Sequence, residues 1–532
     1  MYKEKLKEFF KDKYNLLLIG IVLFTLIIRL KYLFMESLWN DETFYLWYIE
    51  HFFDNPISIF EDRVLSASYL FVFFLAALIR LVVWDIVIAG RIAVILLTLA
   101  TIILTYLIGK ELKDKTTGII AALLLSVNPI YWLISNKFLL DAPLAFSFAF
   151  TVYSLIKFEK IRTKLWAIIL AISIFLTVNT KFSAYLVFPM LATYFFLQYI
   201  FEPLISKHIP TQEIKEFFQN KNLHKSVIYS IFLFLPLTII YLVKYSSIIP
   251  RANTGVIATA TGMAQTVATY NNYSLTFKSL PFLLTQYTLS LFLIGLFFCI
   301  VYRKKVHYIL ISYIITFQIY ITLLLGGITE QRHILPALPG FLILSALAIT
   351  DIKYFIEKLM NKKIYDFIVI GIVIIFICYP LYNQGYSLNE SKSQAYVGYK
   401  GAGIWLKENV DPETSYVLAG APGFIRLFSN FEFVDDEGIA GRPGEGTKDG
   451  VLYYGLRPTK EEFETALKIM ESKRENIYLE LDIWEAGNQG WAYPPTKEKI
   501  EYLQSLGFKP VYAVEKGTGS QKVPMVVIFK KD

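Results

Sequence analysis

Charged side chains that could carry out proton transfer and phosphate binding lie at the ends of apolar segments. The acidic pair Asp41-Glu42 follows the first apolar run, within the aromatic sequence Leu38-Trp39-Asn40-Asp41-Glu42-Thr43-Phe44-Tyr45. Two carboxylates at such a boundary either cap the next helix or act in chemistry at a membrane surface. The other charged residues that adjoin apolar runs on the same predicted side are Lys137, Asp141, Lys181, Glu330, Arg332 and His333.

These residue types would suit a reaction at a phosphate-bearing substrate. Lys181 as a point charge and Arg332 as a bidentate donor could hold a phosphate. A nearby carboxylate could accept the proton of a hydroxyl or amine that attacks the sugar carbon attached to that phosphate. Structural interpretations stand beside this one: Lys181 could snorkel, Asp141 could be an N-cap before a helix, and a polar packing role is open to His333.

The composition predicts a polytopic membrane protein. The 532 residues are 55% hydrophobic and 16% aromatic, with a mean hydropathy of +0.48, which is too apolar for a soluble chain of this length. A net charge of +8 could suggest nucleic acid, but the excess lies in short Lys/Arg clusters between apolar runs, which membrane topology explains. Cys299 and Cys378 lie within apolar runs, which favours packing roles over a disulfide or a metal site.

The distribution of basic loops predicts the topology. Lysines precede the first apolar run, Leu16 to Met35, so we expect a cytoplasmic amino terminus and a retained first helix. If residues 66–84 crossed the membrane, every later basic loop would lie on the opposite side from this terminus. We therefore predict that 37–86 is a first outer loop with interfacial helices, and that the chain has about eleven spans. The basic loops are 110–115, 157–164, 207–225, 303–305 and 353–363.

A second domain is predicted after the membrane domain of residues 1–384. Residues 385–532 are rich in Gly, Glu, Lys and Pro, and the topology places them outside the cytoplasm. Helical periodicity at 402–408 and 460–472 and short strand patterns indicate a small α/β domain; the strands are expected at 415–418, 476–481 and 523–529. Its acidic and aromatic clusters, at 435–437 and 482–485, either assist acceptor binding or form a solvated surface.

Five segments occur in the order found in the GT-C membrane glycosyltransferases, and the chain resembles the protein O-mannosyltransferase and lipid A aminoarabinose transferase group. The segment around Asp41 is similar to the family's Trp-x-Asp-Glu motif. The others are Ala89-Gly90-Arg91-Ile92-Ala93, Leu140-Asp141-Ala142-Pro143 after Asn128-Pro129, Thr180-Lys181-Phe182-Ser183, and Gln331-Arg332-His333-Ile334-Leu335-Pro336.

This resemblance implies an integral membrane protein that acts as an inverting transferase and takes a sugar from a dolichyl or undecaprenyl monophosphate. Asp41 would be the catalytic carboxylate, and Glu42 and Asp141 would position the acceptor or a metal ion. Where the family carries a Pro-Pro motif, this chain has Asp62-Arg63-Val64-Leu65-Ser66, so Arg63 would replace that donor contact. The implied set of donor-phosphate residues is Lys181, Arg332, Arg63 and Arg91, with Lys137 and His333 as acceptor or secondary residues.

Two other functions are weighed against this one. An oligosaccharyltransferase shares the fold, but the carboxyl-terminal region contains no Trp-Trp-Asp-Tyr-Gly sequence. A lipid or solute transporter would show paired interrupted helices in two related halves, and no internal repeat is evident. The sequence demands no cofactor; if a divalent metal takes part, Glu42, Asp141 and His333 are the candidate ligands.

Overall fold

The computed structural model divides the chain into two compact units. The helical unit contains residues up to Leu33 and Ile49–Asn389, and the sheet unit contains Phe34–Tyr48 and Glu390–Asp532. The segment that carries Asp41 and Glu42 therefore belongs to the same unit as the carboxyl-terminal domain. The structure describes residues 10–54, 70–206, 219, 221, 225, 228–229, 274–324, 331–419, 422–429, 431–433, 450–452, 460–484, 496–517 and 522–532.

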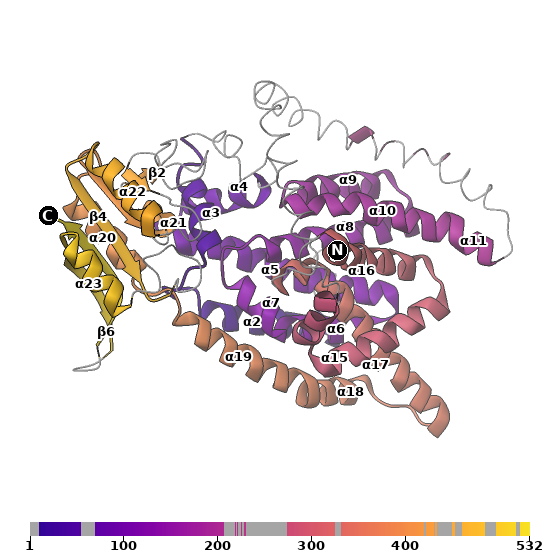
Figure 1. Ribbon diagram of the computed structural model, residues 1–532. Coiled ribbons are helices and arrows are strands. Elements are labelled where there is room, and N and C mark those ends of the chain that lie inside the picture. Colours follow the sequence, from indigo (N-terminus) through magenta and orange to yellow (C-terminus); the bar gives the residue numbers. More distant parts are fainter. Residues whose placement is uncertain are drawn as a thin grey trace. The chain divides into compact units, whose positions relative to one another are not determined.

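The helical unit consists of long apolar helices that pack along one another (Figure 1). Several of these helices are capped by the side chain of the residue just before their first turn. Asp85 accepts hydrogen bonds from the backbone N–H groups of Val87 and Ile88, and Asp114 accepts one from that of Thr117. The helices are α2 (Lys13–Leu30), α4 (Leu70–Arg80), α5 (Ile86–Leu112), α6 (Lys115–Val127), α7 (Pro129–Ser135), α8 (Asp141–Ile161), α9 (Lys164–Val178), α10 (Val187–Phe196), α11 (Glu202–Ile205), α15 (Ser274–Tyr302), α16 (Lys305–Leu324), α17 (Leu338–Met360), α18 (Asp366–Val373) and α19 (Tyr379–Ser393). Shorter 3-10 and π segments, η3 (Phe182–Leu186), η4 (Leu197–Phe201), η5 (Gln331–Ala337) and η6 (Ile374–Cys378), adjoin these helices.

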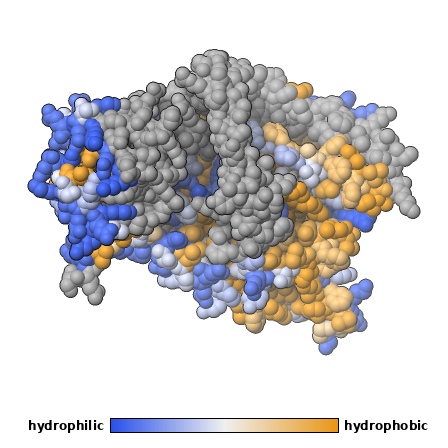
Figure 2. Space-filling view, viewed as in Figure 1, coloured by the Kyte–Doolittle hydropathy of each residue, from blue (hydrophilic) through white to orange (hydrophobic). Residues whose placement is uncertain are grey.

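Within the described part of the chain, six helices are long and apolar enough to cross a membrane, or seven if the bent pair α6–α7 is one span. Large hydrophobic side chains such as Phe297, Ile300 and Phe376 are exposed on this unit, as expected for contact with lipid (Figure 2). Shorter apolar helices account for other expected spans, whereas the run at 226–246 and the loop at 251–273 lie outside the described residues. The count of about eleven spans stays a prediction.

Helix α4 has the dimensions expected of an interfacial helix in the first outer loop. Its 11 residues extend about 16 Å, roughly half of the 30 Å hydrocarbon core. Arg80 in its last turn forms an ion pair with Glu50, with 2.9 Å between Nε and Oε2. The hydrogen bond and charge of Glu50 raise the pKa of Arg80, so the guanidinium keeps its charge at neutral pH.

The helix is interrupted between α6 and α7, and the side chain of a buried arginine forms hydrogen bonds with residues on both sides of the interruption. Pro129 begins α7 after a bend of 63°, and the Asn128 side chain caps the new helix by accepting from the Tyr131 N–H. Arg29 is fully buried; it donates from Nη1 to the Ser126 carbonyl (3.2 Å) and from Nε to the Ser135 hydroxyl (3.0 Å). An arginine within a span either snorkels towards the membrane surface or bonds inside the protein, and Arg29 bonds inside the protein.

The sheet unit confirms the predicted α/β domain. Its strands lie in the order β2-β3-β1-β4-β6-β5, in which the first four are parallel and β6 runs antiparallel to both of its neighbours, β4 and β5. Helices pack beside this sheet, and the hydrophobic core includes Leu418, Phe463 and Leu479 (Figure 1). The elements are α3 (Asn40–Glu50), α20 (Tyr399–Asn409), β1 (Ser415–Ala419), α21 (Pro422–Phe428), β2 (Glu432–Phe433), β3 (Gly450–Leu452), α22 (Lys460–Glu471), β4 (Asn476–Asp482), α23 (Lys497–Ser505), β5 (Phe508–Lys516) and β6 (Val523–Lys531).

The crossing of α15 and α17 provides a test of the helical packing. A Cβ atom on Gly295 would lie 1.9 Å from the Leu344 carbonyl oxygen, so Gly295→Ala should force the two backbones apart and cost about 1–3 kcal/mol. Gly371→Ala is the matched control, because a Cβ there meets nothing within 4 Å. Thermal unfolding in detergent should show a lower midpoint for the first variant only, and equal midpoints would contradict the close crossing.

Candidate active site

A buried ion pair lies at one end of the helical unit. Asp141 is the first residue of α8, and Lys181 follows the end of α9; the distance from Lys181 Nζ to Asp141 Oδ1 is 2.6 Å. The Asp141 side chain is 3% exposed and that of Lys181 is 16% exposed, so the lysine retains some access to solvent. A carboxylate at this first helical position is also stabilised by the helix dipole. The N-cap position itself is Leu140, so Asp141 does not cap the helix through its side chain.

An arginine and a histidine also act on the same carboxylate. Arg332 and His333 lie at the start of η5, which packs against α8, and their charges interact with Asp141 together with that of Lys181. The proline at 336 favours this irregular segment because it lacks an N–H group, and the Tyr313 hydroxyl bonds to its carbonyl. The structure thus brings together four of the predicted site residues from three separate loops.

Helix α4 adjoins this cationic cluster, which we define as Lys181, Arg332 and His333 around Asp141. The Phe71 N–H donates a hydrogen bond to the Asn179 carbonyl at 3.2 Å, two residues before Lys181. The Phe71 ring also stacks on Phe146 of α8, with 6.3 Å between ring centroids. An apolar helix therefore begins beside the polar cluster.

Two of the other residues that the sequence predicted to bind the donor phosphate or the acceptor are buried in the helical unit. Arg91 is fully buried in α5 and donates from Nη1 to the Leu33 carbonyl at 3.1 Å, just where the first helix ends. Lys137 is 2% exposed in the turn between α7 and α8, four residues before Asp141. Arg63 and Glu330 lie outside the described residues, as do the acidic cluster at 435–437 and Glu485.

In the sheet unit, Glu42 holds the start of α3. Its carboxylate accepts a hydrogen bond from the Trp39 N–H at 2.7 Å, and its own N–H donates to the Trp39 carbonyl at 2.9 Å. This is the glutamate half of a capping box, since Glu42 stands three positions after the N-cap residue. Glu42 is fully buried, whereas Asp41 is partly exposed. The helix-capping interpretation of the acidic pair thus applies to Glu42.

Residues of the carboxyl-terminal domain hold the segment that carries Asp41. The Arg426 guanidinium lies 3.3 Å from the centroid of the Trp47 ring, and a Cβ atom on Gly423 would lie 2.3 Å from the Thr43 hydroxyl oxygen. At the segment's start, Glu36 accepts from the Gly398 N–H at 3.0 Å. The sequence analysis missed these residues because nothing in their local pattern links them to a segment more than 350 positions away.

A hydrogen bond of Trp484 holds the chain at Val397, near the start of the carboxyl-terminal domain. The Trp484 indole N–H donates to the Val397 carbonyl at 3.0 Å, and Asp482 accepts from the Trp484 backbone N–H at 2.6 Å. Asp482 is 1% exposed, which contradicts the solvated-surface interpretation for this residue. Among the described residues, His, Cys, Asp and Glu side chains form no group of three that could hold a metal ion.

Comparisons with known proteins agree with this architecture. The family model "Dolichyl-phosphate-mannose-protein mannosyltransferase" matches residues 85–249, which include Arg91, Asp141 and Lys181. No curated protein sequence matches the chain significantly. Among solved structures, ArnT from Cupriavidus metallidurans bound to undecaprenyl phosphate is 12% identical over 96% of this chain and 97% of its own, with a TM-score of 0.60.

A second similar structure is the archaeal oligosaccharyltransferase AglB from Archaeoglobus fulgidus, in complex with an inhibitory peptide and a dolichol-phosphate. It is 13% identical over 97% of this chain and 74% of its own, with a TM-score of 0.58. The chain has the GT-C fold of an integral membrane protein. This fold, together with the family model that matches residues 85–249, agrees with the resemblance seen in the sequence. The more particular likeness is to the mannosyltransferase family, over residues 85–249.

The contact between Gly423 and Thr43 can be tested by a compensating pair of substitutions. Gly423→Ala should push α3 away from α21 and raise amide hydrogen exchange in residues 40–48, while exchange in β1 and β4 stays unchanged. Adding Thr43→Ala removes the clashing hydroxyl and should restore protection. If protection is lost equally with and without Thr43→Ala, α3 is not held by this contact.

Proposed function

We propose that this protein is an inverting glycosyltransferase that moves one sugar from a polyprenyl monophosphate to a protein, lipid or glycan acceptor. The observation that supports it most strongly is the cationic cluster around Asp141 at one end of an apolar helical unit. The mannosyltransferase family model and the undecaprenyl phosphate and dolichol-phosphate bound by the two similar structures favour a lipid-linked donor.

The charge of the cluster fits the proposed donor. Lys181 and Arg332 supply two positive charges and Asp141 one negative charge, so one positive charge remains when His333 is neutral. A sugar linked through a polyprenyl monophosphate is a phosphodiester with one negative charge. The polyprenyl phosphate that leaves carries about 1.5 to 2 negative charges at pH 7. Because the cations interact more strongly as that charge develops, they stabilise the transition state more than the bound donor.

The proposed reaction is a single displacement at the anomeric carbon. The acceptor's oxygen or nitrogen forms the new bond to that carbon from the side opposite the phosphate, and the bond from the carbon to the phosphate oxygen breaks. Asp41 accepts the acceptor's proton, and the leaving phosphate keeps the electron pair of the broken bond. Lys181 and Arg332 bind the leaving phosphate, and inversion follows from the direction of attack.

The other predicted residues take supporting roles in this proposal. Glu42 fixes the backbone that presents Asp41, because its carboxylate caps α3. Asp141 orients the Lys181 ammonium through their ion pair. Arg91 fixes the end of the first helix through Leu33, and Lys137 and His333 stay as secondary residues near the donor. Arg63 is retained as a proposed donor contact.

The proposed orientation follows from charge. The loops that contain Lys110 to Lys115 and Lys157 to Lys164 are basic, which favours the cytoplasmic side for both and for the amino terminus. The cluster around Asp141 lies at the opposite end of α8 from Lys157. We therefore propose that transfer takes place on the extracytoplasmic face, together with the carboxyl-terminal domain, in a cell membrane.

A transfer assay tests the function and the role of Asp41. Purified protein would be incubated with membrane extract and a panel of radiolabelled polyprenyl-monophosphate sugars, and label that leaves the lipid fraction would be measured. We expect transfer by the wild type and a loss of at least about a thousandfold in Asp41→Asn, since the amide cannot accept the proton. Asp41→Asn should still bind the donor.

Three outcomes of this assay would contradict the proposal or one of its parts. Label transferred only from diphosphate-linked glycans would favour the oligosaccharyltransferase alternative, and equal transfer by Asp41→Asn would remove this residue from proton transfer. Absence of transfer from every donor, with binding of none, would contradict the proposed class of substrate. Glu50→Gln, also in α3 but paired with Arg80, serves as the control for an altered carboxylate elsewhere in the same helix.

Inhibition by free polyprenyl phosphate tests the cationic cluster with two changes of opposite sign. Lys181→Met removes a positive charge and should raise the inhibition constant, whereas Asp141→Asn removes a negative charge and should lower it. Each change should be roughly tenfold, about 1.4 kcal/mol. Lys164→Gln, an exposed lysine at the other end of α9, should change nothing. Changes of the same sign in both variants would contradict phosphate binding at this cluster.

A further inference from the structure

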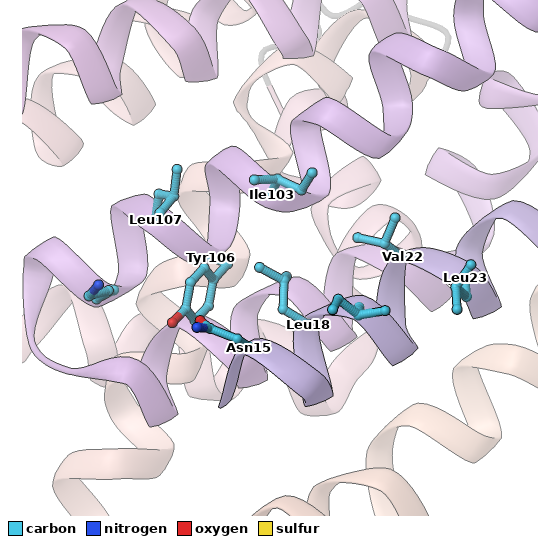
Figure 3. A pocket seen from close by; sticks show the side chains of 9 residues that line it. Asn15, Leu18, Val22, Leu23, Ile103, Tyr106 and Leu107 are labelled. Atoms are coloured by element: carbon cyan, nitrogen blue, oxygen red, sulfur yellow. The ribbon is translucent and has the colours of Figure 1, made fainter. Parts of the chain in front are cut away.

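A groove runs between α2 and α5 in the helical unit, and the proposed reaction does not use it (Figure 3). Its volume is about 550 Å³, within the range of roughly 300–1000 Å³ that is usual for small-molecule sites. Along α2 it extends from Asn15 to Leu23, which is eight rises of about 1.5 Å, or roughly 12 Å. The lining residues are Asn15, Leu18, Ile19, Val22, Leu23, Ile103, Tyr106, Leu107 and Lys110.

The groove is polar at one end and apolar along the rest of its length. Asn15 lies near the start of α2, and Tyr106 and Lys110 lie near the end of α5, so the polar groups gather at one end of the two helices (Figure 3). The remaining lining side chains are all aliphatic. This gradient is that of a lipid molecule, with a polar head at the membrane surface and a hydrocarbon chain below it.

The hydroxyl of Tyr106 is a buried polar group that a ligand could satisfy. The residue is 3% exposed, and its buried hydroxyl has no hydrogen-bond partner among the residues that the structure describes. Its ring fits against Gly118 of α6, where a Cβ atom would lie 2.8 Å from Tyr106 Cδ2. The ring is thus fixed with its hydroxyl beside the polar end of the groove. A buried hydroxyl without a partner is unfavourable unless a ligand or water supplies one.

Lys110 adds a positive charge at the same end. It is exposed and makes no ion pair or side-chain hydrogen bond with a described residue. The nearby acids are already engaged: Asp12 pairs with Lys115, and Glu111 pairs with Lys157 and Lys160. The charge of Lys110 does reach Asp12, but the Asp12 carboxylate is held by Lys115. A basic pocket between membrane helices is a known type of site for an anionic lipid head group.

This end of the unit is distant from the cationic cluster around Asp141. Lys157 and Lys160, near the end of α8, bond to Glu111 near the end of α5. Asp141 begins α8, and the 16 helical rises from Asp141 to Lys157 span about 24 Å. The groove therefore opens near the other membrane surface, which the topology predicts to be cytoplasmic.

We propose that this groove binds an anionic phospholipid, with its phosphate at Lys110 and the Tyr106 hydroxyl and one acyl chain along α2 and α5. The phosphate oxygens would accept hydrogen bonds from both groups, and the chain would contact Leu18, Val22 and Ile103. A bound lipid would also fasten α2 to α5. The proposal does not depend on the transfer reaction, because it concerns a different site.

Native mass spectrometry of the purified full-length protein tests this proposal. The protein would be titrated separately with dioleoyl phosphatidylglycerol and dioleoyl phosphatidylcholine in a neutral detergent, and bound lipids would be counted. We expect one site with at least a fivefold preference for phosphatidylglycerol. Lys110→Gln should remove this preference, and Tyr106→Phe should weaken binding about threefold.

Two further variants separate the groove from the rest of the surface. Val22→Trp should fill the apolar part and abolish binding at this site, while a matched exposed lysine substitution, Lys164→Gln, should leave it unchanged. The proposal is overturned if phosphatidylcholine binds equally well, if Lys110→Gln keeps the preference, or if Val22→Trp binds phosphatidylglycerol as the wild type does. Thermal unfolding of each variant without lipid confirms that it is folded.

Discussion

The ion pair between Lys181 and Asp141 is the interaction on which the helical unit's polar end depends. Removing a charge from water is costly at the end of an apolar bundle, and the contact between the two opposite charges offsets part of that cost. The pair joins the start of α8 to the end of α9, and η5 adds Arg332 and His333 beside it. One buried carboxylate thus interacts with basic side chains from separate loops. The positive charge that exceeds its own negative charge could bind a phosphate.

The same principle, that a buried polar group must have a partner, explains other features of both units. Arg29 bonds to both sides of the α6–α7 break, so the charge that would be unfavourable in an apolar span stabilises an irregular turn there. Glu42 is buried because it caps α3, and the neighbouring Asp41 is thereby left at a defined helical position with partial exposure. In the groove between α2 and α5, the buried Tyr106 hydroxyl lacks such a partner among the described residues, which is why a ligand is inferred there.

Much of the architecture could be predicted from local pattern. The apolar runs at 87–109 and 141–157 correspond to α5 and α8, and the three carboxyl-terminal strands predicted from short strand patterns correspond to β1, β4 and β6. The expected span at 117–135 is broken at Asn128-Pro129, because proline lacks the N–H that a continuous helix needs. The roles assigned to Lys181 and Arg332 stay proposals, whereas their association around Asp141 is a structural finding.

The sequence by itself determined that the chain is a membrane protein with a small α/β domain, because hydrophobic length and periodicity are local properties, and its resemblance to known motifs indicated the GT-C fold. It also identified the charged residues at the ends of the helices. Only the tertiary structure decided that Glu42 is a cap, that Arg426 and Gly423 hold the Asp41 segment, and that Lys181 pairs with Asp141. Except for the cap, these contacts join residues 40 to 380 positions apart, and their geometry depends on how the elements pack.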